Sequence, residues 1–219
     1  MSDAAGYDAA GHDLVGYDPA GYDPAGHDPA GHDPLADVGH VVEVLQSDVP
    51  FAGIVWDIRR ERFAYGDGTL TREFLAHPGA VAVLAVDADD RVLSIQQYRH
   101  PIRTRDWELP AGLLDVAGEP PLEAAKRELA EEADLVAADW QPLISMHTSP
   151  GGSDEVIHVF RATGLSAAPG VFARGSEEAD IVIRWVALDE AVDAVLAGRG
   201  HNGIFQAAVL AEHARRARG

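Results

Sequence analysis

"ELPAGLLDVAGEPPLEAAKRELAEEADL", residues 108–135, is the most informative segment of this 219-residue chain. Its second half predicts a helix over residues 120–132, because two prolines stand at the start, where a missing backbone N–H costs nothing. Leu122, Ala125 and Leu129 are spaced to form one apolar stripe, so that face of the helix is expected to be buried. The first half bends the chain at Gly112, just before the helix.

The acidic residues of this helix predict a metal site. Glu128 and Glu132 are four residues apart and share a face, with Glu131 adjoining them. Because they border the apolar stripe, these like charges are unfavourable unless a cation lies between them. Oxygen donors without Cys or His favour a hard ion, Mg²⁺ or Mn²⁺. The alternative is a solvated acidic face, but the bend at Gly112 favours the metal, since it can aim a backbone carbonyl at the same ion.

The first 37 residues predict an appendage to the folded part. Glycines recur every five residues from Gly6 to Gly31, and the segment holds eight Asp and no Lys, Arg or Glu, a formal charge of −8. A five-residue unit of this composition has no apolar face to bury, so we predict a disordered acidic tail over residues 1–37. The alternative is an unspecific metal-binding tract that uses His12, His27 and His32.

The composition of residues 38–219 excludes several classes of partner. This part carries 17 basic residues and the 28 acidic residues left after the tail, a net charge of −11, which disfavours nucleic acid. The absence of cysteine excludes disulfides and fits a reducing compartment. No signal peptide and no membrane-length apolar run are visible, so a cytoplasmic protein without a membrane partner is expected.

Strands with interspersed helices predict an α+β fold with a mixed sheet. The run 80–86 is continuously apolar and indicates a strand buried on both faces. Residues 79–99 are expected to form two strands joined by an Asp-rich turn, of which the apolar run is the first. The other strands are expected at 41–45, 53–64, a short segment ending near 74, 141–146, 155–163 and 181–187. Two closing helices are expected at 188–196 and 202–218.

The segment 108–135 resembles the Nudix box, which runs Gly, five residues, Glu, seven residues, then Arg-Glu-aliphatic-x-Glu-Glu-x-Gly-aliphatic. The matching positions are Glu119, Arg127, Glu128, Leu129, Glu131, Glu132 and Leu135. In one departure, six residues instead of five separate Gly112 from Glu119. In the other, Asp134 replaces the glycine, and Asp tolerates the left-handed backbone expected there, though less readily. Neither departure removes a metal ligand.

Flanking segments extend the resemblance to the ADP-ribose pyrophosphatase branch of this family. They are "QQYRHPIRTRDWELPAGLLD" at 96–115, "SPGG" at 149–152 and "EEAD" at 177–180. The similarity covers roughly residues 50–210 and implies a Nudix-type α/β/α sandwich with a mixed β-sheet. It also implies an N-terminal antiparallel strand section over 38–77 that pairs two subunits into a homodimer, and a Nudix hydrolase domain over 78–219.

The resemblance assigns metal ligands in the box. Glu128 and Glu132 would bind Mg²⁺ (Mn²⁺ being possible) together with the backbone carbonyl of Ala111, and Glu131 would support them. Arg127 would orient the cluster by pairing with a nearby carboxylate such as Glu119 or Glu131. The alternative for Arg127 is an ordinary surface ion pair.

The resemblance places the catalytic base outside the box, on the loop that contains "GSEEAD". Glu177 is expected to be the base and Glu178 a further metal ligand, although the two can exchange roles, and Glu155 is the runner-up. Arg99 is expected to contact the substrate phosphates, for which a fixed guanidinium fork is suited.

Arg72 and Trp56 lie in the N-terminal strand section, which in this family pairs with a second subunit and helps to hold the adenine. Both are therefore expected to bind substrate and to reach the neighbouring site. For Trp56 the alternative, packing in the core or in the dimer interface, is favoured.

The implied function is Mg²⁺-dependent hydrolysis of the pyrophosphate bond of ADP-ribose, or a related ADP-sugar, to AMP and ribose 5-phosphate. One alternative keeps the chemistry but acts on another nucleoside diphosphate or sugar nucleotide. A second alternative is a non-catalytic sensor of nucleotide sugars. The intact carboxylates and the lack of a basic helix-turn-helix segment disfavour the sensor.

Overall fold

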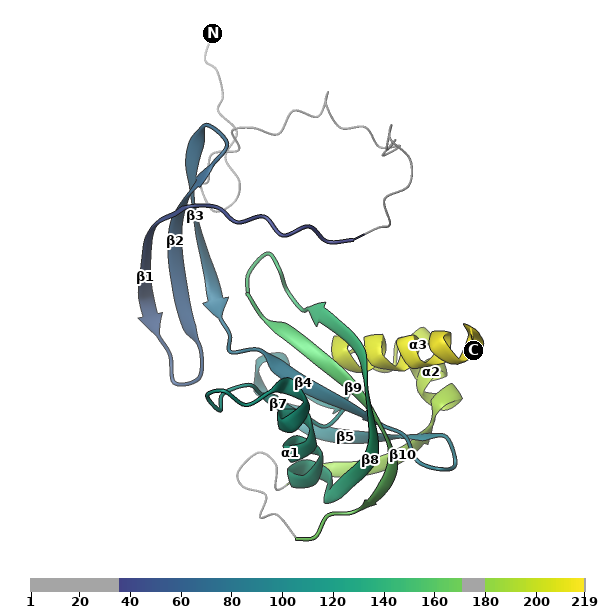
Figure 1. The fold of residues 1–219 in the computed structure, drawn as a ribbon. Coiled ribbons are helices and arrows are strands. Elements are labelled where there is room, and N and C mark those ends of the chain that lie inside the picture. The colour runs from purple at the N-terminus through teal and green to yellow at the C-terminus, as the bar shows by residue number, and fades with distance from the viewer. Residues whose placement is uncertain (1–35, 171–179, 219) are drawn as a thin grey trace. The chain divides into compact units, whose positions relative to one another are not determined.

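A computed structural model describes residues 36–170 and 180–218 of the chain (Figure 1). The chain divides into two units, residues 1–41 and 42–219. Almost all of the expected acidic tail lies outside the described residues, and residues 36–41 have no regular secondary structure. The second unit contains all of the strands and helices described below.

Three antiparallel strands form the N-terminal sheet, in the order β1-β2-β3. They are β1 (Val44–Ala52), β2 (Asp57–Tyr65) and β3 (Gly68–Ala76). The expected strand at 53–64 begins only at Asp57, because residues 53–56 turn the chain and the Gly53 N–H donates to Asp57 Oδ1 at 3.1 Å. The expected strand at 41–45 is likewise shifted to Val44–Ala52, since pairing with β2 sets its extent.

Two further sheets form the centre of the fold. One has the order β7-β4-β9-β8, with β4 (Ala80–Ala85) parallel to β9 (Val156–Ala167) and antiparallel to β7 (Ala111–Leu113). β8 (Leu135–His147) completes it. The other has the order β10-β5-β6, formed by β10 (Val182–Ala187), β5 (Arg91–Arg99) and β6 (Thr104–Glu108). A short 3₁₀ helix, His100–Ile102, connects β5 to β6. The expected mixed sheet is confirmed.

β4 lies at the middle of the core, as the apolar run 80–86 predicts. All six of its residues are buried. Ala82 and Leu84 belong to one core cluster, whereas Val81 and Val83 belong to another, as expected for side chains that alternate between the faces of a strand. The strand therefore joins two apolar layers.

Helices cover both layers and complete an α/β/α sandwich (Figure 1). α1 (Pro121–Ala133) packs on the layer that contains Val81 and Val83, through Ala124, Ala125 and Leu129. α2 (Leu188–Leu196) and α3 (Gly203–Arg218) pack on the other layer. None of the helices described in residues 36–170 and 180–218 has the length and apolar character to cross a membrane.

Glu212 ties α3 to the central sheet. Its side chain is completely buried, and it accepts hydrogen bonds from Arg161 of β9 at 3.1 Å and from Arg215 and Arg216 of α3 at 2.9 and 2.8 Å. Burial alone would raise the pKa of Glu212, but the three arginines lower it to about 2. A buried carboxylate with this many cationic donors stays ionised and fixes the helix on the sheet.

The turn from α1 into β8 explains one error in the expected strands. β8 begins at Leu135 instead of near 141, because Asp134 adopts φ 54° and ψ 35° and turns the chain directly out of the helix. The left-handed conformation expected for Asp134 is thus confirmed. β6 and β7 were not expected as strands, since their shortness leaves no periodic pattern and pairing with β5 and β4 defines them.

Candidate active site

The site is built around two buried glutamates on α1. Glu128 and Glu132 are 9% and 5% exposed, and their helix packs with its apolar stripe on the core, so they border that stripe as the sequence predicts. Glu132 Oε2 accepts a hydrogen bond from the Ala111 N–H of β7 at 2.8 Å. This bond places the backbone of Ala111 beside the helix carboxylates.

Gly112 leaves room for Glu128. A Cβ atom built on Gly112 would lie 2.1 Å from the carboxyl carbon of Glu128, well inside ordinary contact distance. The backbone conformation of Gly112 is not left-handed, so the glycine is required for space and not for its torsion angles. The bend expected at Gly112 is a short strand, β7, whose missing side chain makes the pocket for this carboxylate.

Arg127 joins the acidic residues of the box. Its Nε and Nη2 donate to the two oxygens of Glu119 at 3.2 and 3.0 Å. Its Nη1 donates to Glu128 at 2.5 Å and to Glu131 at 3.2 Å. The hydrogen bonds to Glu119 and the charge of Glu128 raise the pKa of Arg127 above its usual range, so the guanidinium stays a cation. The structure thus places Arg127 against three carboxylates, including both partners considered from the sequence.

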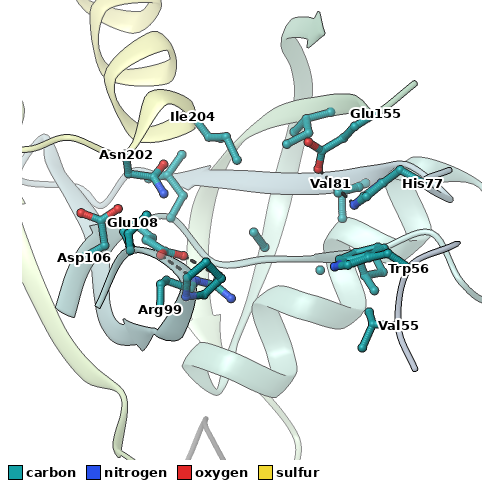
Figure 2. A pocket seen from close by; sticks show the side chains of 18 residues that line it. Val55, Trp56, His77, Val81, Arg99, Asp106, Glu108, Glu155, Asn202 and Ile204 are labelled. Carbon is teal, nitrogen blue, oxygen red and sulfur yellow. Dashed lines mark hydrogen bonds and ion pairs between the residues drawn. The ribbon is translucent and has the colours of Figure 1, made fainter. Parts of the chain in front are cut away.

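A cavity of about 600 Å³ lies next to these residues (Figure 2). β7 contributes Ala111 and Gly112 to its wall, so the cavity adjoins the carboxylate helix. Its other lining residues come from the β1–β2 turn, the β3–β4 connection, β4, β5, the 3₁₀ helix, β6 and the residues just after it, β9 and the segment before it, and the start of α3. A concave site of this size suits a small-molecule ligand.

Arg99 lines the cavity at the end of β5 and is held by Glu108 of β6. Its Nε and Nη2 donate to the two carboxylate oxygens of Glu108 at 2.8 and 2.6 Å, and Gln97 donates to the same carboxylate at 3.3 Å. Glu108 is buried, with a side chain 5% exposed, whereas that of Arg99 is 42% exposed. The paired geometry fixes the plane of the guanidinium at the cavity wall.

An aromatic and acidic group forms another part of the wall. Trp56 stacks on His77 with ring centroids 4.2 Å apart, and His77 Nε2 lies 3.2 Å from Glu155 Oε1. The Gly79 N–H donates to His77 Nδ1 at 3.0 Å, so Nε2 is the nitrogen that donates toward Glu155. Thr148 also donates to Glu155. Trp56 is therefore a cavity residue as well as a packing residue.

The "SPGG" turn fixes the end of β3 beside this group. The Leu75 N–H donates to the Gly152 carbonyl at 2.9 Å, and the His77 N–H donates to Asp154 Oδ1 at 2.8 Å. Arg72 lies outside the first cavity, exposed on β3, where it lines a second cavity of about 530 Å³ with the "SPGG" turn. Within one chain the structure does not bring Arg72 together with Arg99 or the α1 carboxylates.

Glu177 and Glu178, the expected base and further metal ligand, lie outside the described residues. Sequence reasoning also missed four polar residues that line the cavity: His77, Asp106, Glu108 and Asn202. Asp106 and Glu108 are two positions apart in β6 and therefore share a face of that strand. Recognising "DWE" as a strand would have predicted two acidic groups on one side.

The side chains of the box suit a hard divalent ion in their chemistry. The donors beside Gly112 are carboxylate oxygens, and no sulfur or imidazole takes part, which matches the preference of Mg²⁺ and related ions. Among the residues that the structure describes, no three ligating side chains converge into a ready-made cage. Instead, Arg127 donates hydrogen bonds to both Glu128 and Glu131 and holds these two carboxylates together.

The α/β/α sandwich and the carboxylate helix define the class of this protein. The family model of the NUDIX domain matches residues 76–207, and the chain belongs to this family. The resemblance drawn from the box is therefore confirmed.

Two named relatives and one solved structure are similar to most of this chain. The ADP-ribose pyrophosphatase of Mycobacterium tuberculosis (strain ATCC 25618 / H37Rv) is 45% identical over 176 residues, which cover 80% of this chain and 84% of the relative. The methanol dehydrogenase activator of Bacillus methanolicus is 37% identical over 152 residues, 68% of this chain and 80% of the relative. The crystal structure of an ADP compounds hydrolase matches with a TM-score of 0.69 at 18% identity, covering 84% of this chain and 99% of that chain, and shows the same fold.

Proposed function

We propose that this protein hydrolyses the pyrophosphate bond of ADP-ribose, or of a related ADP-sugar, to AMP and ribose 5-phosphate. The observation that carries the proposal is the 45% identity, over 80% of the chain, to an ADP-ribose pyrophosphatase. The site supports it, because a fixed arginine and a carboxylate helix adjoin one cavity. The proposed place of action is the cytoplasm, and no nucleic acid or membrane is involved.

We propose Mg²⁺ as the metal, with Mn²⁺ as a substitute. Glu128, Glu131, Glu132 and the Ala111 carbonyl would hold it, together with Glu178. When bound, the ion neutralises charge on the phosphate oxygens and lowers the pKa of water. The burial of Glu128 and Glu132 supports this assignment, since the single guanidinium of Arg127 already faces three carboxylates and a further cation would reduce the repulsion among them.

The remaining roles belong to side chains around the cavity. Arg99 is proposed to bind the diphosphate, because Glu108 fixes its guanidinium plane. Arg127 is proposed to position Glu128 and Glu131 through their hydrogen bonds. Trp56, stacked on His77 at one end of the cavity, offers an aromatic face for the adenine.

Glu177 is proposed as the general base. Glu155, the runner-up, accepts hydrogen bonds from His77 and Thr148. These contacts occupy both oxygens of the Glu155 carboxylate, Oε1 through His77 and Oε2 through Thr148. The contacts of Glu155 therefore support a positioning role beside Trp56 and His77 in preference to proton abstraction.

The protein is proposed to act as a homodimer. Several large apolar side chains of the N-terminal sheet and its β1–β2 turn are exposed, among them Val49, Phe51 and Ile54. Exposed apolar residues gathered on one sheet support an interface with a second subunit. Arg72, on the same sheet, would then contribute to the partner's site.

The test is AMP release from ADP-ribose, with and without Mg²⁺, by the wild type, Glu132→Gln and Glu123→Gln. Glu123 lies on the exposed face of α1, paired with Lys126, and serves as the control. We expect Mg²⁺-dependent release that falls at least about 100-fold in Glu132→Gln and is unchanged in Glu123→Gln. Tight binding of ADP-ribose without turnover would favour a sensor, whereas neither binding nor turnover would favour another nucleoside diphosphate.

A further inference from the structure

We infer that Asp106, held by Asn202, is a specificity-determining residue that selects substrates whose distal phosphate carries an uncharged polyhydroxylated group. The inference rests on the proposed function and narrows its substrate class. Nucleoside triphosphates, in which a third phosphate takes the place of the sugar, are disfavoured by the same residue.

The cavity has ends of different chemistry (Figure 2). Trp56 and His77 lie at one end, with Glu155 paired to His77, Asp106 and Asn202 lie at the other, and Arg99 with Glu108 lies between them. This order of an aromatic group, a cation and an acid–amide pair matches a molecule with a base, a diphosphate and a group that donates hydrogen bonds. A sugar has hydroxyl donors for that last position, whereas a phosphate has none when ionised.

Asp106 is held in place from two sides. It lies in β6 opposite Gln97 of β5, and it is 8% exposed. Asn202 Oδ1 accepts a hydrogen bond from the Phe205 N–H at 2.9 Å at the start of α3. The oxygen of this amide is therefore committed to the helix, and its NH₂ group is the part that hydrogen-bonds Asp106. One such bond uses only part of the acceptor capacity of a carboxylate, so Asp106 can accept further bonds from a ligand.

The charges near Asp106 favour a neutral donor over an anion. Burial raises the pKa of Asp106, and the charge of Glu108 raises it further. Glu108 is itself ion-paired with Arg99, so the charge of this arginine is already partly neutralised. A phosphate placed beside Asp106 and Glu108 would add a third negative group in a poorly solvated site, where repulsion is strong. A hydroxyl group instead donates hydrogen bonds to the carboxylate, which is too buried to receive them from water.

The test combines a change in the enzyme with a matched change in the substrate. kcat and KM are measured with Mg²⁺ for ADP-ribose and for the propyl ester of ADP, which has the same diphosphate but no sugar hydroxyls. The enzymes are the wild type, Asp106→Asn and, as control, Asp193→Asn on the exposed side of α2. ATP is assayed as the third substrate, with AMP as the product.

We expect the wild type to prefer ADP-ribose over propyl-ADP by roughly 10- to 100-fold in kcat/KM, because a hydrogen bond to a charged group is lost. In Asp106→Asn this preference should shrink to within about threefold, mostly through a higher KM for ADP-ribose, while cleavage of ATP rises. Asp193→Asn should behave as the wild type. When the losses in kcat/KM from the change in the enzyme and the change in the substrate are not additive, Asp106 and the sugar hydroxyls interact directly.

Other outcomes overturn the inference. If Asp106→Asn lowers kcat/KM for ADP-ribose and propyl-ADP by the same factor, Asp106 supports the fold and does not read the sugar. If the variant does not fold, the wild type alone still decides, since equal turnover of ADP-ribose and propyl-ADP excludes recognition of the hydroxyls. If the wild type cleaves neither compound, the proposed function itself fails, and the inference fails with it.

Discussion

Replacing Gly112 with alanine should inactivate the protein without unfolding it. The new Cβ would lie 2.1 Å from the Glu128 carboxyl carbon, whereas ordinary contacts begin at 3.4 Å, so the carboxylate must retreat by about 1.3 Å. The clashing atoms are the far end of a flexible side chain, so the cost in stability should be small, about 1 kcal/mol. A displacement of about 1 Å in a catalytic group, by contrast, lowers rates roughly 100-fold.

The assay for Gly112→Ala measures AMP release and thermal unfolding on the same preparation. Gly68→Ala, in the β2–β3 hairpin, is a matched control, because no atom lies closer than 4.0 Å to a Cβ at that position. We expect turnover of Gly112→Ala to fall about 100-fold with a shift in Tm of a few degrees. Turnover within threefold of the wild type in a folded Gly112→Ala protein would refute the argument that this glycine makes room for Glu128.

Two further predictions concern stability. Glu212→Gln should lower the free energy of unfolding at pH 7 by about 3 kcal/mol, because it leaves three arginines around a neutral group. Since the pKa of Glu212 is lowered to about 2, its charge stabilises the fold above the unfolded-state pKa and this contribution is lost as pH falls toward 2. Urea unfolding should therefore show a smaller difference between variant and wild type at pH 3 than at pH 7, and an equal difference would contradict the assignment. Asp134→Gly should raise the free energy of unfolding by about 0.5–1 kcal/mol, because glycine adopts φ 54° without strain, and an unchanged or lower Tm would argue against strain there.

The sequence predicted the elements whose signals are local. The limits of α2 and the start and end of α1 were placed to within one residue, because prolines and Gly198 mark them. The buried strand at 80–86 followed from its unbroken apolar run. The carboxylates of α1 were located because helical periodicity alone puts Glu128 and Glu132 on one face.

The parts that sequence reasoning missed depend on contacts between distant segments. β6 and β7 are too short to show a period, and without them Asp106 and Glu108 have no recognisable direction. His77 becomes a site residue only because the "SPGG" turn holds the end of β3 against the cavity. Asn202 could not be predicted as a site residue for the same reason, since its role depends on where α3 begins relative to β6.

The stacking of Trp56 on His77 has a consequence for how this protein can diversify. The family model begins at residue 76, yet Val55 and Trp56 of the preceding hairpin line the cavity. A catalytic domain trimmed at that boundary would keep the carboxylate helix and lose the wall at the aromatic end. On the roles proposed above, recognition of the base would therefore be encoded on a stretch of chain separate from the carboxylate helix. An exchange of residues 42–75 between homologues should transplant the preference for the base while the hydrolytic centre stays as it was.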